Sequence, residues 1–432
     1  MNDRDRQILG IALPAIVTNI TVPLLGMVDT AIVGHMGAAA YIGAVAVGSM
    51  IFNLVYWVFG FLRMGTSGLT AQARGRRDLT EVTRLLVRSA SVSMAVALAL
   101  IVLQWPLCEL MLSLLGPTAD VRPLAATYFY IVVWGAPASL GLFALTGWFI
   151  GMQNTRLPML VSICQNVVNI LASLLLVYGL DMKIEGVALG TVVAQYAGVL
   201  LGVALLLRYY RRLWRGIAVR DVFLKSELVR FFRVNRDIFL RTVFLVAVNF
   251  YFTSAGARQG AVVLAVNTLL LQLYLLFSYV MDGFAYAGEA LGGRYWGAGN
   301  RVAFSAVVER LFRWGALMVM LFTAVYVAGG MPFLHLLTDE PQVVAASREY
   351  VWWAYLIPLV GVAAFVWDGI FIGITQTRGM LQSSLIAAAV FFVSVAVLTR
   401  LMGNHGLWLS MLLYLFSRGL VQTIIFCNRV AR

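Results

Sequence analysis

Long apolar segments without a charged residue recur along the whole chain. Examples are residues 42–61, 89–103 and 381–398. Such runs approach the ~20 residues that a helix needs to cross about 30 Å of hydrocarbon. They lack the two-residue alternation of membrane β-strands, and lipid offers no partner for the backbone groups of an open strand. The pattern therefore predicts an all-α polytopic membrane protein.

Hydropathy and turn residues divide the chain into twelve predicted transmembrane helices. The predicted spans are 8–34, 42–68, 87–113, 124–151, 157–180, 186–207, 238–257, 262–291, 313–335, 350–374, 380–402 and 406–427. The first span follows a short polar start and shows no small-residue cleavage site. We therefore expect it to be retained and not removed as a signal peptide.

The basic residues predict the orientation of these helices. If both termini face the cytoplasm, the Lys and Arg residues left on the outer side are Arg122, Lys183, Arg258, Arg348 and Arg400. The others lie on the cytoplasmic side, and many of them fall within 208–236, as the positive-inside rule requires. Topology thus accounts for the formal charge of +13 without a nucleic-acid partner. We expect a bacterial-type inner-membrane protein whose basic segment contacts membrane lipid.

Composition and motifs argue against an enzyme. Only 12% of the residues are charged, far below the roughly 25% of soluble domains. HExxH, Walker-type and GxSxG patterns do not occur, so we expect no catalytic residue and no bound metal, and an ion gradient replaces ATP as the energy source. The isolated candidates for such chemistry are Cys108, Cys164, Cys427, His35, His335 and His405. An integral membrane enzyme is the weakest of the alternatives.

The chain repeats itself with a period near 222 residues. Residues 147–151 and 155–156 match 369–373 and 377–378. An even number of spans separates the repeats, which predicts two six-helix lobes related by a pseudo-two-fold axis along the membrane normal. The predicted division is an N-lobe at 1–207, a basic cytoplasmic linker at 208–237 and a C-lobe at 238–432. Two lobes that rock against each other favour a transporter.

Four acidic residues fall within the predicted spans. They are Asp29, Asp282, Glu289 and Asp368. A carboxylate at membrane depth costs several kcal/mol unless it is protonated, paired or hydrated, so such residues usually face a cavity. Asp29 lies in a span that contains Pro14 and Pro23, which remove helix hydrogen bonds and permit a bend. The alternative is a carboxylate satisfied by neighbouring polar groups, without a transport role.

Other polar residues in the spans are candidates for a substrate or cation cavity. Asp282 and Glu289 lie two turns apart with Tyr286 between them. In the first half, Asn166, Asn169 and Ser173 form one stripe of a predicted helix. The remaining candidates are Thr191 and Gln195 of the next span, Asn249, which the repeat places beside the position of Asp29, and Asp368. Hydrogen bonds between neighbouring helices are an equal alternative for these polar residues.

Six segments spread over nearly the whole chain form a specific set. They are LPAIVTNITVPLLGMVDTAIVGHMG at 13–37, FLRMGTSGLTAQARG at 61–75, VNRDIFLR at 234–241, MDGFAYAGEA at 281–290, WDGIFIG at 367–373 and GNHGLWL at 403–409. Together they resemble the DinF-type branch of the multidrug and toxic compound extrusion (MATE) family. The resemblance implies twelve helices in two lobes and export of cationic or amphipathic compounds driven by inward movement of H⁺ or Na⁺.

The resemblance also implies roles for individual residues. The family carboxylate that matches Asp29 is implicated in ion coupling, and bending of that helix at the proline matching Pro23 is implicated in substrate release. Asn169 matches the asparagine of the family's fifth-helix motif, whereas Ser173 replaces its usual aspartate. One N-lobe carboxylate is therefore missing.

This departure bears on the coupling ion. A lone buried carboxylate can be neutralised by one proton, whereas Na⁺ needs several oxygen ligands, so H⁺ is favoured over Na⁺ here. We expect a monomeric multidrug antiporter that works by alternating access. A flippase for lipid-linked precursors, from the same superfamily, is the main alternative and would require a basic cavity.

Overall fold

The computed structural model describes residues 3–34, 39–214, 219–338 and 340–430, without the side chains of 22–27, 30, 39, 214 and 219–220. Nearly all of these described residues are helical and none belongs to a strand. The predicted all-α class is confirmed. His35 and the side chain of Pro23 lie outside the described residues.

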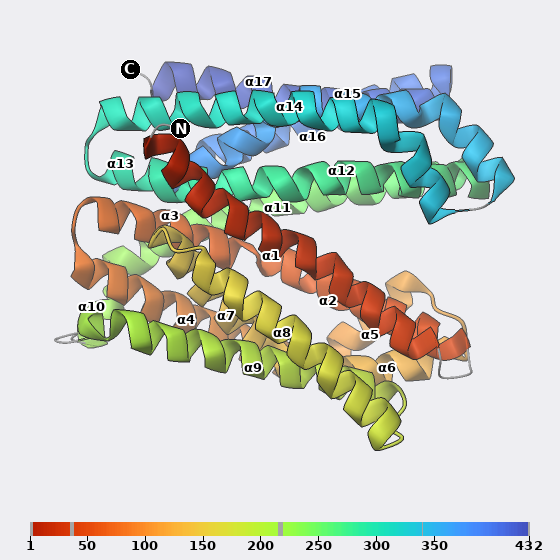
Figure 1. Cartoon of the computed structure of the whole chain (residues 1–432), viewed down its shortest axis with the longest axis horizontal. Coiled ribbons are helices and arrows are strands. Elements are labelled where there is room, and N and C mark those ends of the chain that lie inside the picture. Colours follow the sequence, from red (N-terminus) through yellow and green to blue (C-terminus); the bar gives the residue numbers. More distant parts are fainter. Residues whose placement is uncertain (1–2, 35–38, 215–218, 339, 431–432) are drawn as a thin grey trace. The chain divides into compact units, whose positions relative to one another are not determined.

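The described residues of the first half of the chain form ten α-helices, α1 to α10 (Figure 1). Their bounds are α1 (Asp3–Gly34), α2 (Ala39–Phe59), α3 (Phe61–Gly75), α4 (Leu79–Val102), α5 (Gln104–Leu115), α6 (Val121–Val132), α7 (Ala136–Gly151), α8 (Arg156–Leu174), α9 (Ile184–Tyr210) and α10 (Val219–Val222). Three short segments continue them: the 3₁₀ turns η1 (Val133–Gly135) and η3 (Arg211–Trp214), and the π-helical turn η2 (Leu175–Gly179).

The second half consists of longer helices. Their bounds are α11 (Lys225–Arg258), α12 (Ala261–Ala287), the π-helical turn η4 (Gly288–Gly292), α13 (Gly293–Gly297), α14 (Arg301–Leu337), α15 (Pro341–Gly373), α16 (Thr377–Met402) and α17 (Asn404–Arg429). Helix α15 packs against α12, α14 and α17, which run beside it (Figure 1). It is the central helix of this half.

Eleven segments of the described chain are long and apolar enough to cross a membrane. Helix α1 comes in addition, because its 32 residues would extend roughly 48 Å at about 1.5 Å per residue. Most helices extend beyond the predicted spans, since hydropathy marks the apolar part of a helix and not its polar ends. The third predicted span, 87–113, is wrong at its end. There α4 stops at Val102 and α5 begins at Gln104, because Pro106 has no N–H with which to continue the helix.

The described chain divides into two compact units. The first-half unit is Val17–Phe231, and the second-half unit comprises the residues up to Ile16 and those from Phe232 onward. Helices α1 and α11 therefore each begin in one unit and continue in the other. The lobe boundaries at 1–207, 208–237 and 238–432 stay predictions.

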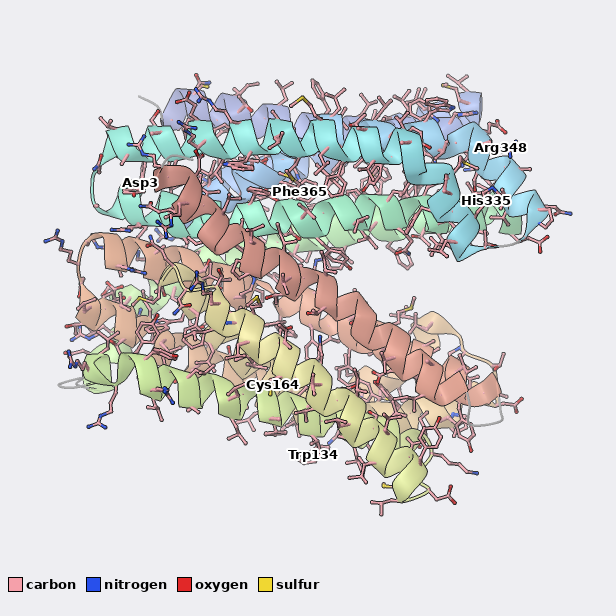
Figure 2. The ribbon with its side chains drawn as sticks, in the orientation of Figure 1. Asp3, Trp134, Cys164, His335, Arg348 and Phe365 are labelled. Atoms are coloured by element: carbon pink, nitrogen blue, oxygen red, sulfur yellow. The ribbon has the colours of Figure 1, made fainter. Side chains whose placement is uncertain are left out.

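The first turns of α1 are integral to the second-half unit. Asp5 pairs with Arg310 of α14 at 3.4 Å, and its Oδ1 accepts a hydrogen bond from Trp314 Nε1 at 3.2 Å. Ile8 is fully buried there. Within this unit, Asp3 lies at the opposite end from His335 and Arg348 (Figure 2).

The structure repeats its turns as the sequence repeats its residues. After α7, Gln153 adopts a φ of 59°, and Thr375 after α15 adopts a φ of 54°. The backbone hydrogen bonds of the two turns match, including Gln153 N to Ile150 O at 2.7 Å and Thr375 N to Ile372 O at 3.0 Å. Left-handed backbone is uncommon for such side chains, so its recurrence at the predicted period supports the internal repeat.

A second pair of turns repeats in the same way. Arg77 has a φ of 62° and Gly299 a φ of 69°. The next residues, Asp78 and Asn300, each cap the following helix with a side-chain oxygen at 2.9 Å from a backbone N–H. Side-chain caps of this kind satisfy donors that the first helical turn leaves free.

Two glycines allow the corresponding helices to touch at the backbone. A Cβ at Gly147 of α7 would lie 2.3 Å from the carbonyl oxygen of Arg63 in α3, and a Cβ at Gly369 would lie 2.2 Å from that of Ala285 in α12. Only glycine fits at such distances. The glycines of the repeated motif thus permit the same close helix contact in each unit.

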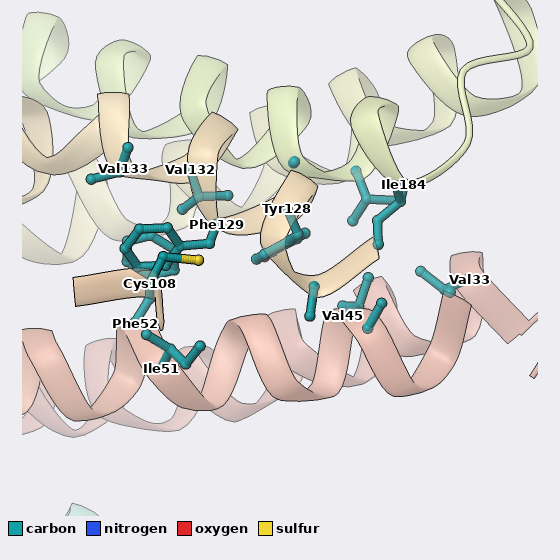
Figure 3. Packing of buried hydrophobic residues seen from close by; sticks show 14 of the residues in the cluster. Val33, Val45, Ile51, Phe52, Cys108, Tyr128, Phe129, Val132, Val133 and Ile184 are labelled. Carbon is teal, nitrogen blue, oxygen red and sulfur yellow. The ribbon is translucent and has the colours of Figure 1, made fainter. Parts of the chain in front are cut away.

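Apolar side chains fill each unit and also cover its outer helix faces. In the first-half unit, Phe52, Tyr128 and Phe129 form a buried cluster with Cys108 (Figure 3). Trp134, by contrast, points outward and is 54% exposed (Figure 2). Exposed apolar residues of this kind suit a lipid surface, as the predicted membrane class requires.

Candidate coupling and cavity sites

Asp29 is buried in the last turns of α1. Its side chain is 7% exposed, and Oδ1 has no hydrogen-bond partner among the described residues. The backbone of α1 is helical from Asp3 to Gly34, through both prolines. An ionised carboxylate without a partner is costly in such a place, and a single proton removes most of that cost.

The polar stripe of α8 faces α1 and α9. Asn166 Nδ2 donates to the carbonyl oxygen of Thr21 in α1 at 3.2 Å, and Asn169 Nδ2 donates to Thr191 Oγ1 of α9 at 3.3 Å. The phenol of Tyr128 on α6 lies close to the Thr191 hydroxyl and interacts electrostatically with Asp29. Helices α1, α6, α8 and α9 of the first-half unit therefore meet at Asp29, Asn169 and Thr191.

Several oxygens in this group are buried but not hydrogen-bonded. They are Oδ1 of Asp29, Oδ1 of Asn169 and Oγ of Ser173, none of which has a hydrogen-bond partner among the described residues. Gln195 of α9 is also buried, and its Oε1 lies beside Gly135. Buried oxygens with unused lone pairs, one of them on a carboxylate, are suited to a proton or a small cation. This arrangement is the candidate coupling site.

Ser173, which stands where the family usually has an aspartate, lies at a tightly packed position. Ser173 is fully buried, and a Cβ at Gly190 of α9 would lie 2.3 Å from its Oγ. Helices α8 and α9 therefore approach closely at this point. A longer aspartate side chain at 173 has little room, which fits the absence of the second carboxylate.

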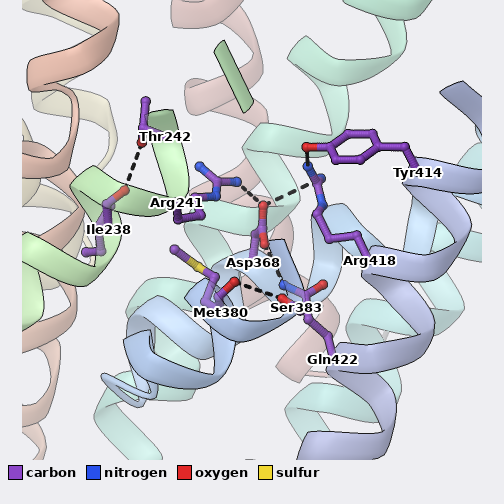
Figure 4. Close-up of polar contacts among 9 residues, drawn as sticks. All are labelled: Ile238, Arg241, Thr242, Asp368, Met380, Ser383, Tyr414, Arg418 and Gln422. Atoms are coloured by element: carbon purple, nitrogen blue, oxygen red, sulfur yellow. Dashed lines mark hydrogen bonds and ion pairs between the residues drawn. The ribbon is translucent and has the colours of Figure 1, made fainter. Parts of the chain in front are cut away.

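Asp368 in the second-half unit has a different environment. It forms an ion pair with Arg241 of α11 and a second with Nη2 of Arg418 on α17, at 3.6 Å (Figure 4). Gln422 Nε2 donates to its Oδ1 at 2.7 Å, and Arg418 Nη1 donates to the hydroxyl of Tyr414 at 3.4 Å. Two guanidinium groups thus compensate one buried carboxylate. The role of Asp368 in a substrate or cation cavity stays a prediction.

Arg241 and Arg418 were missed by reasoning from the sequence. Both are buried, and both lie within predicted spans. Among the charged residues within the spans, only the acidic ones were considered from the sequence. Arg418, a basic residue in the middle of the last predicted span, could have been recognised in the same way. The pairing with Asp368 itself joins three helices and leaves no trace in local spacing.

The other second-half candidates stay predictions. Glu289 is buried in the π-helical turn η4, while Asp282 and Tyr286 are half-buried on α12. Asn249 Nδ2 donates to the Leu245 carbonyl of its own helix at 2.9 Å. Among the described residues, no three His, Cys, Asp or Glu side chains gather closely enough to hold a metal ion.

An all-helical membrane protein with two repeated halves and buried polar groups in each has the features of a multi-pass membrane transporter. The MatE family profile matches residues 14–175 and 238–398, one stretch in each half. The chain belongs to the MatE family. It is therefore a multidrug and toxic compound efflux transporter with small-molecule substrates, and not an enzyme.

Individual relatives agree with this assignment. The chain is 37% identical over 422 residues to DNA damage-inducible protein F of Escherichia coli K12, covering 97% of this chain and 91% of that protein. It is 22% identical to the probable multidrug resistance protein NorM of Thermotoga maritima, covering 79% and 74%. A crystal structure of MATE in the bent conformation matches with a TM-score of 0.90 at 17% identity, covering 100% of this chain and 96% of the other.

Proposed function

We propose that this transporter exports cationic or amphipathic small molecules in exchange for protons, with Asp29 as the coupling carboxylate. The observation that carries the proposal is the unequal state of two buried carboxylates. Asp29 has a free acceptor oxygen among the described residues, whereas Asp368 is held by two arginines. Only the first can gain or lose a proton without breaking an ion pair.

Protonation of Asp29 would couple to movement through α1. The ionised form requires hydration or a partner, and the neutral form tolerates apolar surroundings. A change between the two forms alters the packing of the last turns of α1, in which Pro23 supplies a point where the helix can bend. Alternating exposure of Asp29 to the two sides of the bacterial inner membrane then links proton entry to substrate exit. Both termini face the cytoplasm in this scheme.

Sodium is the second candidate for the coupling ion. The buried, unpartnered Oδ1 of Asn169 and Oγ of Ser173 are oxygens of the kind that hard cations prefer. They are neutral, however, and the usual second carboxylate is absent at 173. A single proton therefore satisfies this site more readily than an ion that needs several ligands.

The flippase alternative has one observation in its favour. Arg241 and Arg418 are buried basic residues of the kind that a precursor with phosphate groups would require. Both are engaged with Asp368, which leaves their charge partly compensated. We therefore prefer small-molecule export.

The test is transport in proteoliposomes with the two gradients imposed separately. Export of a fluorescent cation should follow a pH gradient and not a Na⁺ gradient, and Asp29→Asn should abolish it. Asp181→Asn is the matched control, because Asp181 is exposed in a turn and the same chemical change there should leave transport intact. Transport that follows only the Na⁺ gradient would replace the proton with sodium. Movement of a lipid-linked sugar in place of the dye would support the flippase.

A further inference from the structure

A small charged pocket lies within the first-half unit, beside the first turns of α11. Its charged lining residues are Arg76, Glu81, Arg88, Glu227 and Arg230. They come from the end of α3, the first turns of α4 and the first turns of α11. All of them belong to the first-half unit, and none takes part in the coupling site.

Arg88 is the buried element of this pocket. Its side chain is 1% exposed, and its guanidinium donates from Nε to the Val222 carbonyl at 2.9 Å and from Nη1 to Glu81 Oε1 at 3.1 Å. Nη2 is also buried and has no partner among the described residues. A buried guanidinium nitrogen without an acceptor is costly, so the pocket contains a donor that an anionic ligand would satisfy.

The charges around Arg88 favour an anion. Three arginines and two glutamates line the pocket, and Glu81 is already engaged by Arg88. Arg84, nearby on α4, is paired with Asp221 of α10 at 2.7 Å and does not require a further acceptor to balance its charge. Arg88 pairs with Glu81, so the excess of one positive charge rests on Arg76 and Arg230, which face Glu227 in the same lining. Guanidinium groups bind phosphate oxygens through paired, charge-assisted hydrogen bonds.

We propose that this pocket binds the phosphate of an anionic phospholipid headgroup. On the proposed topology it lies at the cytoplasmic surface, where anionic lipids attract clusters of Lys and Arg and where basic pockets between helices bind such headgroups. The bound phosphate accepts from Arg88 Nη2 and from the more accessible Arg76 and Arg230. It thereby joins α4 to the first turns of α11, the helix that continues into the second-half unit.

Binding is tested on the purified full chain by native mass spectrometry during titration with phosphatidylglycerol or phosphatidylcholine. The wild type should retain phosphatidylglycerol preferentially. The double variant Arg76→Gln and Arg230→Gln, whose side chains are partly or fully exposed, should bind it more weakly, by roughly fivefold for each arginine removed. Arg122→Gln is the matched control, because Arg122 pairs with Glu109 at 2.7 Å far from the pocket in sequence and its loss should not alter retention.

Arg88→Gln tests the buried donor itself, with thermal unfolding recorded to separate a folding defect from a binding defect. Equal retention of both lipids by the wild type, or unchanged retention by the folded double variant, would overturn the proposal. Stabilisation of the protein by inorganic phosphate alone, without a lipid preference, would assign the pocket to a free phosphate and also overturn the lipid assignment. Lipid binding does not depend on the proposed function. The Asp29→Asn variant should bind lipid normally even though it does not transport.

Discussion

The two halves of this chain share a fold but treat their buried carboxylates in opposite ways. In the first half, Asp29 interacts electrostatically with the phenol of Tyr128, and its Oδ1 has no hydrogen-bond partner among the described residues. In the second half, Asp368 is fixed by Arg241, Arg418 and Gln422. The two halves therefore share their helix packing but not the surroundings of their buried carboxylates. The surroundings of Asp29 allow its charge to change, whereas those of Asp368 hold its charge constant.

This difference suggests a division of labour between the halves. A carboxylate held by two guanidiniums on different helices ties those helices together, and protonation would leave two buried positive charges unpaired. A carboxylate without such partners can change its protonation state at much lower cost. We therefore expect ion coupling in the first half. In the second half we expect the ion pairs to hold the helices in a fixed arrangement. Similar changes in each half test this contrast.

The largest effect on stability is expected from Asp368→Asn. This change leaves two buried guanidiniums without their counter-charge and should reduce the free energy of unfolding by about 3–5 kcal/mol. Asp29→Asn should leave stability nearly unchanged and remove proton-driven transport. Unfolding in mixed detergent micelles and transport in proteoliposomes measure the two effects. Equal stability losses at the two positions would show that Asp29 also has a strong partner.

Smaller and nearly equal effects are expected where the halves are alike. Gly147→Ala and Gly369→Ala each place a methyl group against a backbone carbonyl and should destabilise the protein by about 1–3 kcal/mol. Gly329→Ala on α14 is the control, since no atom lies within 4 Å of the added Cβ; it should be neutral or slightly stabilising. A large loss at only one of the two paired glycines would contradict equivalent packing of the repeats.

Ser173→Asp probes why the first half has a single carboxylate. The longer side chain must fit against Gly190, and we expect a loss of roughly 1–2 kcal/mol from overpacking. The measurement is thermal unfolding, with Ser173→Ala as the control for loss of the hydroxyl. A fully stable aspartate variant that gains Na⁺-driven transport would instead show that space is available and that the missing carboxylate sets the ion.

The smallest effects are expected at two asparagines. Asn169→Ala removes a hydrogen bond between α8 and α9 and should cost about 1 kcal/mol, together with a severalfold loss of transport. Asn249→Ala removes only a bond within its own helix and should cost less than about 0.5 kcal/mol. Unfolding and transport of both variants, compared with the wild type, provide the measurement. Equal transport defects would place Asn249 in a functional cavity as well.

Much of the fold could be predicted because it depends on local patterns. Apolar runs define the helices, and Gly147 and Gly369 repeat because each permits the same backbone contact. The interruption at Leu103 was missed, although Pro106 signals it, because hydropathy does not change there. The polar stripe of Asn166 and Asn169 followed from helix spacing alone.

The second-half cluster could not be predicted in the same way. Arg241, Asp368 and Arg418 are separated by long stretches of sequence and meet only through the packing of three helices. Helix spacing predicts which residues share a face but not which faces meet. The ion pairs of Asp368 therefore depend on helix packing that the sequence pattern does not specify.

The sharing of α1 between the two compact units has a consequence for any attempt to separate the halves. A fragment severed within the linker would retain residues 3–16 but lose the helices that cover Ile8 and engage Asp5. The C-terminal fragment would lack residues 3–16 and would expose the surface that they cover in the second-half unit. Neither piece is expected to be autonomous, and co-expression of both should be needed to regain a stable protein.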